Sequence, residues 1–238
     1  MIAIISQARI NSSRLPNKIF LEAGGKPFLW YHLERLKKAG LPIIIATTDN
    51  GSEKPIVAFC EQHDILCFRG DEKNVLKRFY DCALKYNVGT IIRVTSDCPL
   101  IDGKIIAKGV ADYKHQSPNT YYSNALERTY PRGMDYEVFS FDMLKTAYEN
   151  ATDESDKEHV TPYIWKNRQG NIILKHDINK ENNSNYRITL DTAEDLLLIK
   201  KLIEEYDAAK LNCKGIIKVL KDNPVLVEIN KHIEQKKP

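Results

Sequence analysis

The sequence predicts an α/β fold with a mostly parallel sheet, because apolar runs rich in β-branched residues alternate with helix-like segments. Pro42–Thr47 (PIIIAT) and Thr90–Thr95 (TIIRVT) are typical of strands that are buried on both faces of such a sheet. Asn74–Tyr86 lies between them in the chain and carries an apolar stripe at helical spacing. A length of 238 residues suits one domain. We therefore expect a single domain over residues 1–238, with a loop-rich insert at about 118–167.

The predicted elements follow one another in a strand–helix rhythm that weakens after Asp102. Apolar, β-branched runs predict strands at Met1–Ser6, Pro42–Thr47, Leu66–Phe68, Thr90–Thr95, Asn171–His176 and Tyr186–Leu190. Apolar stripes and helix-capping residues predict helices at Pro27–Lys38, Pro55–His63, Asn74–Tyr86, Phe141–Tyr148, Lys157–Asn167, Thr192–Tyr206 and Asn223–Gln235. Pro118, Pro131 and Gly133 favour turns and extended segments, so residues 118–140 are expected to form the first part of the insert.

The bulk composition excludes several classes of protein. The 35 basic and 32 acidic residues leave a net charge of +3, without the domain-wide basic excess of a nucleic-acid-binding protein. The five cysteines are odd in number and show no CxxC spacing, which indicates reduced thiols rather than a disulfide frame or a zinc site. Neither a signal peptide nor an apolar run of the roughly 18–20 residues needed for a membrane span is visible. We expect a cytoplasmic protein without a nucleic-acid or membrane partner.

A polar loop rich in cations and hydroxyls follows the first apolar run of the chain. Its polar side chains are Arg9, Ser12, Ser13, Arg14 and Lys18. Open α/β sheets bind ligands at the carboxyl ends of their strands, and guanidinium and ammonium groups neutralise phosphate oxygens there. The loop contains neither the Walker nor the dinucleotide glycine motif. It predicts a polyphosphate site of another kind, with a solvated surface loop as the alternative.

The pattern R-[VI]-T-x-D occurs twice, at Arg93–Asp97 and at Arg187–Asp191. If the two strands are neighbours in one parallel sheet, both carboxylates emerge at the same edge. Asp97 and Asp191 would then form a site for Mg²⁺, which binds one or two protein carboxylates together with substrate phosphates and waters. The alternative is that each aspartate caps the turn or helix that follows it.

A third set of charged residues lies in or next to the insert. Its members are Arg132, Asp135, Glu137, Glu158 and His159. Such a mixed set suits the binding of a hydroxylated or carboxylated small molecule, and His159 is a candidate general base. The alternative is a structural network of ion pairs with a surface histidine.

Short motifs run through nearly the whole chain in a fixed order. They are Gln7-Ala8-Arg9, Ser12, Arg14-Leu15-Pro16, Lys18, Ala46–Thr48, Phe68–Gly70, Thr95–Asp102, Tyr130–Gly133, Glu158–Tyr163 and Leu190–Leu196. In this order they resemble the sugar cytidylyltransferases, the family that contains the CMP-Kdo and CMP-acylneuraminate synthetases. The resemblance is greatest to the SpsF-like branch of spore-coat polysaccharide biosynthesis.

This resemblance implies a Rossmann-like nucleotidyltransferase fold of the GT-A type with three layers, CTP as donor and a homodimer. It implies that Arg9, Arg14 and Lys18 bind the triphosphate and that Asp97 and Asp191 hold Mg²⁺. We assign catalysis to Arg9, Arg14, Lys18 and Asp97. We assign nucleotide binding to Gln7, Ala8, Arg9, Ser12, Arg14, Lys18, Thr47, Arg69 and Ser96. We assign acceptor binding to Arg132, Asp135, Glu137, Glu158 and His159, in an insert that would also serve dimerisation.

The expected activity is Mg²⁺-dependent transfer of CMP from CTP to a sugar, with release of pyrophosphate, for a surface polysaccharide or glycoconjugate. The acceptor would be a nonulosonic acid, a Kdo-like sugar or a sugar phosphate. One alternative is a glycosyltransferase of the same fold that uses a nucleotide sugar, although Cys98 and Pro99 follow Asp97 where an Asp-x-Asp motif would continue. Another alternative is a nucleotide-binding protein without catalytic activity.

Overall fold

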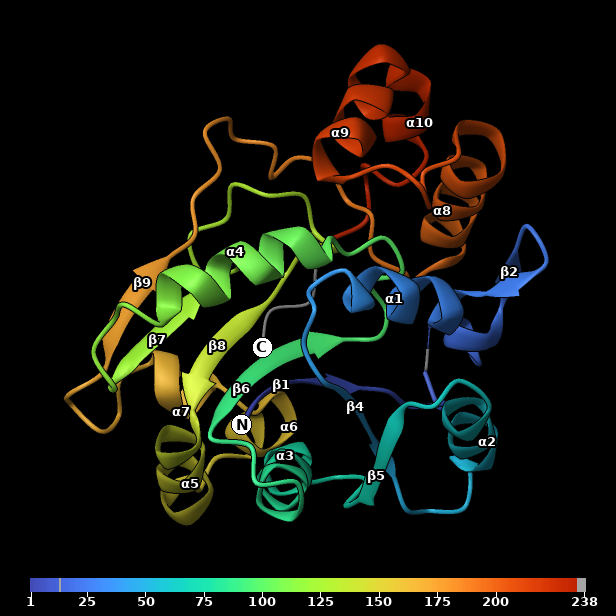
Figure 1. The fold of residues 1–238 in the computed structure, drawn as a ribbon. Helices are drawn as coiled ribbons and strands as arrows, with labels where there is room; N and C mark the ends of the chain where they lie inside the picture. Colours follow the sequence, from blue (N-terminus) through green and yellow to red (C-terminus); the bar gives the residue numbers. More distant parts are fainter. Residues whose placement is uncertain (13, 235–238) are drawn as a thin grey trace.

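A seven-stranded sheet with helices on both faces forms the body of the molecule (Figure 1). The computed structural model describes residues 1–12 and 14–234. Ser13 of the polar loop and Gln235, the expected end of the last helix, lie outside these residues. The three-layer α/β architecture confirms the predicted fold class.

The strand order of the sheet is β5-β4-β1-β6-β8-β7-β9. The strands are β1 (Ile2–Gln7), β4 (Ile43–Thr48), β5 (Leu66–Gly70), β6 (Thr90–Thr95), β7 (Thr120–Ser123), β8 (Glu137–Ser140) and β9 (Ile173–His176). All neighbours pair in parallel except β8, which is antiparallel to both β6 and β7. A separate two-stranded ribbon consists of β2 (Glu22–Ala23) and β3 (Lys26–Pro27). Every residue of β4 is buried, as its run of β-branched side chains predicts.

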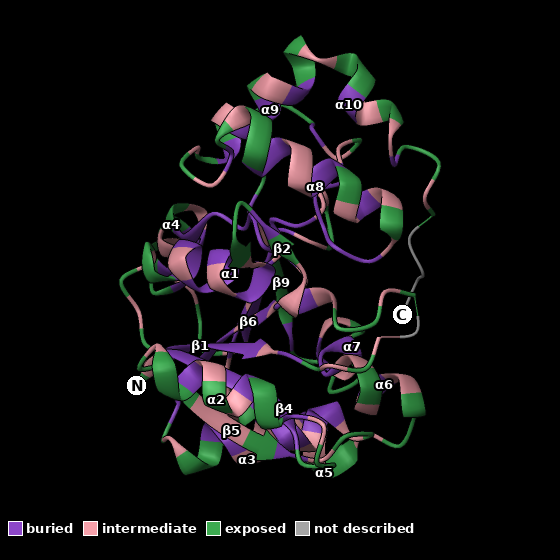
Figure 2. Cartoon of the chain, turned by 90° about the vertical axis from the view of Figure 1, so that its right-hand side faces the viewer, coloured by how far each residue is buried: buried purple, intermediate pink, exposed green. Residues whose placement is uncertain are grey.

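Helices cover both faces of the sheet and form a cap at one side (Figure 1). They are η1 (Lys18–Phe20), α1 (Phe28–Lys37), α2 (Lys54–Gln62), α3 (Val75–Lys85), α4 (Gly103–Tyr113), α5 (Phe141–Asn150), α6 (Glu154–His159), α7 (Pro162–Trp165), α8 (Ala193–Tyr206), α9 (Cys213–Asp222) and α10 (Pro224–Glu228). Side chains of α1 and α4 share one apolar cluster, and those of α3 and α5 share another on the opposite face. A third cluster joins α8, α9 and α10 to Phe28 and Tyr31 of α1. Figure 2 shows the strands as mostly buried, with exposed positions on the outer sides of the helices.

Polar side chains fix several helix starts. The carboxamide of Asn74 accepts a hydrogen bond from the Lys77 backbone at the start of α3, and Asp102 caps α4 in the same way. At α8, Thr192 and Asp195 form a reciprocal capping box. These residues satisfy backbone N–H groups that the first turn of a helix leaves without partners.

The structure corrects the expected elements in the second half of the chain. Tyr186–Leu190 is not a strand, because it makes only one isolated bridge, between Arg132 and Arg187. The helix expected over Lys157–Asn167 is interrupted at Val160, whose φ of 72° is incompatible with helix, and the segment contributes to α6 and α7.

Three further differences concern the insert, helix α4 and the helical cap, which consists of α8, α9 and α10. The segment at 118–140 supplies β7 and β8 to the main sheet rather than loops alone, although turns connect them. Helices α4 and α9 were not expected from the sequence. The last helix ends at Glu228 in the described part of the chain, and the Asn223 side chain does not cap it.

Gly109 on α4 allows a close contact that an alanine would destroy. A Cβ at this position would lie 1.8 Å from the hydroxyl oxygen of Tyr136, which donates a hydrogen bond to buried Asp177. Alanine normally favours a helix over glycine by about 1 kcal/mol, but overpacking a core costs about 1–3 kcal/mol. We expect Gly109→Ala to lower the free energy of unfolding in urea denaturation.

The control is Gly89→Ala, where the nearest atom to the added Cβ is the Met1 carbonyl oxygen at 3.9 Å. Its stability should stay within about 0.5 kcal/mol of the parent protein. A Gly109→Ala variant that is as stable as the parent would show that Tyr136 moves aside at no cost.

Candidate active site

A cleft of about 730 Å³ opens where β1 and β6 end, and most of the predicted functional residues line it. Those that do are Gln7, Ala8, Arg9, Ser12, Arg14, Lys18, Ser96, Asp97, Arg132, Asp135, Glu137, Glu158, His159 and Asp191. The cleft lies at the carboxyl ends of parallel strands, the usual ligand position in open α/β sheets. The three sets of residues singled out in the sequence therefore belong to one site.

Two predicted nucleotide-binding residues do not line the cleft. Thr47 lies on β4 and is completely buried, so its side chain is inaccessible to a ligand. The guanidinium of Arg69 instead forms an ion pair with buried Glu53. The assignment of both residues to nucleotide binding stays a prediction.

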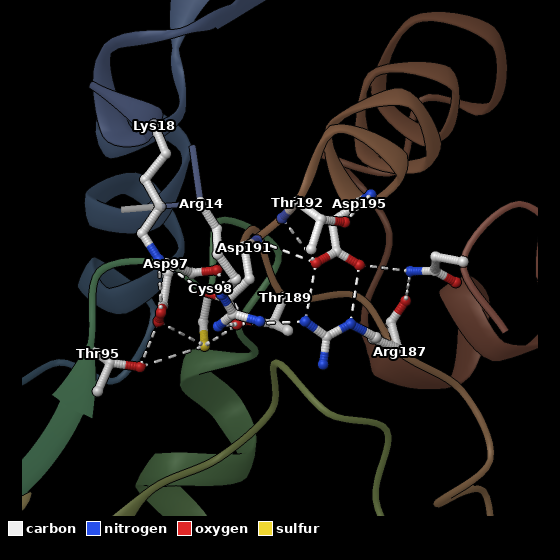
Figure 3. Close-up of polar contacts among 11 residues, drawn as sticks. Arg14, Lys18, Thr95, Asp97, Cys98, Arg187, Thr189, Asp191, Thr192 and Asp195 are labelled. Carbon is white, nitrogen blue, oxygen red and sulfur yellow. Dashed lines mark hydrogen bonds and ion pairs between the residues drawn. The ribbon is translucent and has the colours of Figure 1, made fainter. Parts of the chain in front are cut away.

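Lys18 joins the two aspartates of the repeated motif (Figure 3). Its ammonium nitrogen lies 3.0 Å from Oδ2 of Asp97 and 2.7 Å from Oδ1 of Asp191. Burial opposes the charge of Lys18, but the two carboxylates raise its pKa, and Lys18 in turn holds the pKa of Asp97 well below its usual range. Arg14 approaches Asp191 at 3.4 Å. Both carboxylates thus converge on one cation.

The two carboxylates meet by a different route from the one expected. Tyr186–Leu190 is not a neighbouring strand, but its backbone bonds to Arg132 and to the turn after β6, with Leu190 N donating to Asp97 O at 2.8 Å. Gly133 makes this contact possible, because a Cβ there would lie 2.5 Å from the carbonyl oxygen of Ile188. The close approach of two backbones therefore delivers Asp191 to the site.

The buried ion pair between Arg187 and Asp195 holds Asp191 in position. Arg187 donates to Asp195 through Nε and Nη2, both at 2.8 Å, and to Asp191 Oδ2 at 3.2 Å. Asp195 also accepts a hydrogen bond from the Asp191 backbone at 3.0 Å. The N-cap of α8 is Thr192. Asp191 therefore does not cap this helix, contrary to the alternative considered from the sequence.

His32 supports the turn that carries Asp97. Because a carbonyl oxygen only accepts, Nδ1 of His32 must donate to the Cys98 carbonyl at 2.9 Å, and Nε2 then accepts from the Ser6 hydroxyl at 2.8 Å. Burial lowers the pKa of His32 to about 4, so the ring is neutral at pH 7. On the other side of the turn, the Thr95 hydroxyl donates to Asp97 Oδ1.

Glu137 belongs to a network of hydrogen bonds in the wall of the cleft. Arg93 donates to its Oε2 at 2.6 Å, while the hydroxyls of Tyr121 and Thr161 donate to its Oε1 at 2.7 and 3.0 Å. Arg93 also donates to the Gln7 carboxamide at 3.1 Å. Its partners show that Glu137 joins several strands of the sheet, which matches the structural alternative for this residue.

The other acceptor-site candidates are less constrained. Asp135 forms a two-pronged ion pair with Arg128, which the sequence analysis did not single out. Arg132 lines the cleft and has no ion-pair partner among the described residues. Its burial and the positive charge of Arg128 both lower the pKa of Arg132. Glu158 is exposed. Arg132 therefore offers to a ligand a guanidinium that only the nearby charge of Asp135 offsets.

His159 precedes a strained turn. Val160 has φ 72° and ψ −52°, and Thr161 N donates to His159 O at 2.8 Å, which closes a three-residue γ-turn. Such a conformation costs a β-branched residue roughly 1–3 kcal/mol, and the buried Val160 side chain holds it in place. Burial lowers the pKa of His159 below its ordinary value, which favours the neutral ring.

The donor set at Asp97 and Asp191 fits a hard divalent cation. Two carboxylates are what Mg²⁺ takes from protein when substrate phosphates and waters complete its coordination. Among the described residues, no group of three or more His, Cys, Asp or Glu side chains is suited to a metal. The two carboxylates are thus too few to coordinate a metal ion by themselves, and the phosphates of a nucleotide would supply further ligands.

Comparison with known proteins assigns the chain to a family. The sequence matches the cytidylyltransferase family model over residues 2–231. The chain belongs to the cytidylyltransferase family. An uncharacterised protein of Methanocaldococcus jannaschii, MJ1063, is 36% identical over 98% of this chain and 95% of its own length. The spore coat polysaccharide biosynthesis protein SpsF of Bacillus subtilis is 29% identical over 94% of this chain and 95% of its own.

A solved cytidylyltransferase of Leptospira borgpetersenii has a similar structure, with a TM-score of 0.90 at 30% identity over 99% of each chain. The resemblance seen in the sequence and the nucleotidyltransferase fold it implied are therefore confirmed. None of the described helices of this cytidylyltransferase combines the length and apolar character needed to cross a bilayer.

Several cleft residues of this cytidylyltransferase were not assigned to a site from the sequence, although some lie within its motifs. They are Val75, Arg78, Arg93, Thr95, Ala125, Leu126, Arg128, Thr161, Pro162 and Trp165. For Arg78 a signal was available, because it stands three residues after Val75 on the apolar face of α3, where a cation is unexpected. Nothing comparable marks Arg128, which reaches the cleft from a loop.

The buried ring of His32 makes the stability of this cytidylyltransferase depend on pH. Its pKa is about 4 in the folded chain and 6.5 in model peptides, so the unfolded chain binds more protons between these values. The free energy of unfolding therefore falls as the pH is lowered from 6.5 to 4, by up to about 3 kcal/mol from this residue. Urea denaturation over this pH range measures the slope.

His32→Gln provides the comparison, because the glutamine does not titrate and the other groups are common to both proteins. We expect a flatter dependence of stability on pH for this variant. An unchanged slope would mean that other groups cause the loss.

Proposed function

We propose that this cytidylyltransferase transfers CMP from CTP to a sugar-type acceptor in a Mg²⁺-dependent reaction. An acceptor oxygen attacks the α-phosphorus, and the bond to the β-phosphate breaks with release of pyrophosphate. The observation that carries this proposal is the convergence of Asp97 and Asp191 on Lys18, within 3.0 Å, beside a loop of cations. Two carboxylates and several cations around one point suit a polyphosphate with its metal ion.

The donor side of the cleft would act by positioning and charge. Arg9, Arg14 and Lys18 would neutralise the phosphates and the departing pyrophosphate, since phosphoryl transfer needs little covalent help from a protein. Asp97 and Asp191 would hold Mg²⁺, which supplies Lewis-acid polarisation of the phosphate oxygens when bound. Because Lys18 keeps the pKa of Asp97 low, that carboxylate stays ionised and ready to bind a cation at neutral pH.

The acceptor side would recognise a negatively charged sugar. Arg132 offers a guanidinium without an ion-pair partner in the described part of the chain, and a carboxylate or phosphate is its natural ligand. Both carboxylate oxygens of Asp135 accept hydrogen bonds from Arg128, which would hold the carboxylate in place to accept a further hydrogen bond from a sugar hydroxyl. The neutral His159 ring would accept a proton from the attacking hydroxyl. This chemistry fits a nonulosonic acid, a Kdo-like sugar or a sugar phosphate.

The glycosyltransferase alternative requires an Asp-x-Asp metal motif. The most similar segment of this chain, Asp135-Tyr136-Glu137, does not support it. Asp135 pairs with Arg128, Tyr136 is buried, and Glu137 is bound by Arg93. This segment is therefore not a set of free metal ligands. A role in surface polysaccharide synthesis is supported by the likeness to SpsF of Bacillus subtilis.

The proposal extends to a homodimer in the cytoplasm. All five cysteines are free thiols, as expected in a reducing compartment. Ile173 and Leu174 on β9, at the edge of the sheet, are exposed apolar side chains that a second copy of the chain would cover.

The aspartate pair gives the first test. We expect Asp97→Asn and Asp191→Asn each to lower CTP-dependent pyrophosphate release at least about a hundredfold, because each removes a carboxylate that would hold the Mg²⁺ ion at the phosphates. Excess EDTA should stop release, and added Mg²⁺ should restore it.

The matched control is Asp207→Asn, an exposed position at the end of α8 whose left-handed backbone asparagine tolerates. It should keep parental activity. Full activity of both site variants would refute the proposed mechanism.

Arg132 gives the second test. Arg132→Gln should raise KM for an acid or phosphate acceptor at least about tenfold, since a charge-assisted hydrogen bond contributes about 1.5–3 kcal/mol. KM for CTP should stay nearly constant. In the surface variant Lys210→Gln, KM for the acceptor and KM for CTP should both stay at the parental values. A rise in KM for CTP alone in Arg132→Gln would assign this residue to the donor instead, and an equal rise in both KM values would refute its specific role at the acceptor.

A further inference from the structure

The turn between β4 and α2 brings together the groups needed for a reaction of the chain with itself. It contains Asn50-Gly51, the only place in the sequence where a glycine follows an asparagine. Glycine has no Cβ to shield its backbone nitrogen, which can reach the Asn50 side chain and close a succinimide ring. Both residues are exposed, so water can reach them. The turn does not line the cleft.

Three donors converge on the carbonyl oxygen of the Asn50 side chain. Oδ1 accepts hydrogen bonds from the Ser52 hydroxyl at 2.7 Å, the Ser52 backbone N–H at 3.0 Å and the Thr48 hydroxyl at 3.2 Å. Because a backbone N–H only donates, its partner is the carboxamide oxygen and not the nitrogen. Donors placed in this way stabilise the negative charge that develops on an oxygen when a nucleophile attacks its carbon. The contacts therefore both orient and activate the Asn50 carboxamide.

A carboxylate accepts a hydrogen bond from the nitrogen that would attack. Gly51 N donates to Oε2 of Glu53 at 2.7 Å, and the other oxygen of Glu53 forms an ion pair with Arg69. A hydrogen bond from its own backbone N–H lowers the pKa of Glu53 more than burial raises it, and the Gly51 N–H and Arg69 lower it further. Glu53 is therefore ionised at neutral pH and oriented to accept the Gly51 proton.

We propose that Asn50 is a site of self-modification, at which the Gly51 nitrogen attacks Cγ of Asn50 and converts it to aspartate and isoaspartate through a succinimide. Glu53 accepts the Gly51 proton as the N–Cγ bond forms. The bond from Cγ to Nδ2 then breaks, and the departing nitrogen takes this proton and leaves as ammonia. Water opens the ring by adding its hydroxyl to one carbonyl carbon, and its other hydrogen goes to the ring nitrogen. Attack on Cγ gives aspartate, and attack on the backbone carbonyl gives isoaspartate.

This reaction goes beyond the proposed transfer of CMP, because it needs water as its only co-reactant. It replaces a neutral carboxamide by a carboxylate, so the formal net charge of +3 falls by one. Isoaspartate also inserts a methylene group into the backbone between β4 and α2. The ion pair of Glu53 with Arg69 joins this turn to β5, so the modified turn stays attached to the sheet.

The rate of conversion in the folded protein tests the proposal. The intact protein is incubated at neutral pH, and modification of Asn50 is followed by peptide mapping with mass spectrometry and by labelling with an isoaspartate methyltransferase. The same chain unfolded in guanidinium chloride keeps the Asn50-Gly51 sequence but loses the contacts of the turn. We expect conversion at least about tenfold faster in the folded protein, since a positioned general base contributes about 10²–10⁴-fold. This comparison needs no substitution, so it does not depend on whether a variant folds.

Two variants separate the base from the donors. Glu53→Gln keeps an acceptor for the Gly51 N–H but removes the carboxylate, so the rate should fall at least about tenfold. Ser52→Ala removes the hydroxyl donor but keeps the backbone donor, so we expect a smaller loss of about threefold. Thermal melting should show that both variants are folded.

Two controls accompany these variants. Glu61→Gln makes the same change at an exposed position near the other end of α2 and should keep the parental rate. Asn182 is an internal control, because its Oδ1 also accepts a backbone hydrogen bond, from Ser184 N at 3.0 Å, but no glycine follows it. Asn182 should remain unmodified while Asn50 reacts.

Two results would overturn the proposal. If Asn50 reacts no faster in the folded protein than in the unfolded chain, the contacts of the turn do not promote the reaction. If folded Glu53→Gln converts at the parental rate, Glu53 does not accept the Gly51 proton. Neither result depends on CTP or on pyrophosphate release, so the proposed function stands or fails separately.

Discussion

The buried ion pair between Arg187 and Asp195 connects the helical cap to the edge of the sheet where the cleft opens. Arg187 is 7% exposed and the Asp195 side chain is completely buried, and two hydrogen bonds of 2.8 Å join them. Removing one partner of such a pair costs roughly 3–5 kcal/mol, because the other charge remains buried. Asn230, near the end of the described chain, also donates to Asp195 at 2.8 Å. Asp191 is therefore positioned by contacts that extend from Arg132, in the loop before β8, to the C-terminal segment.

The cations of the cleft fall into two groups with different consequences for binding. Arg14 and Lys18 are close to carboxylates, so their charges already offset those of Asp97 and Asp191. Arg9 and Arg132 have no ion-pair partner among the residues that the structure describes. A polyanionic ligand is attracted by this second group, while the first holds the two carboxylates close together. The cations of the second group thus favour the binding of an anionic ligand in the cleft.

A buried polar network gives the opposite wall of the cleft its shape. Glu137 accepts hydrogen bonds from Arg93, Tyr121 and Thr161, which lie on β6, on β7 and after the strained turn at Val160. Because the three donors come from different elements, a shift of one element breaks the network. The strain at Val160 is tolerated because this network and the apolar core hold both sides of the turn. His159 is thereby kept at the rim of the cleft.

The sequence by itself determined the local elements of the first half, the polar loop with its cations and the two aspartates that line the cleft. β-branched runs and helical stripes are encoded within short windows, so Thr90–Thr95 matches β6 residue for residue. Only the tertiary structure decided that Tyr186–Leu190 reaches Asp97 as a backbone-bonded loop, since that contact joins residues far apart in the chain. It likewise decided that Arg69 faces Glu53 and that Arg78 faces the cleft, because side-chain partners depend on packing between elements.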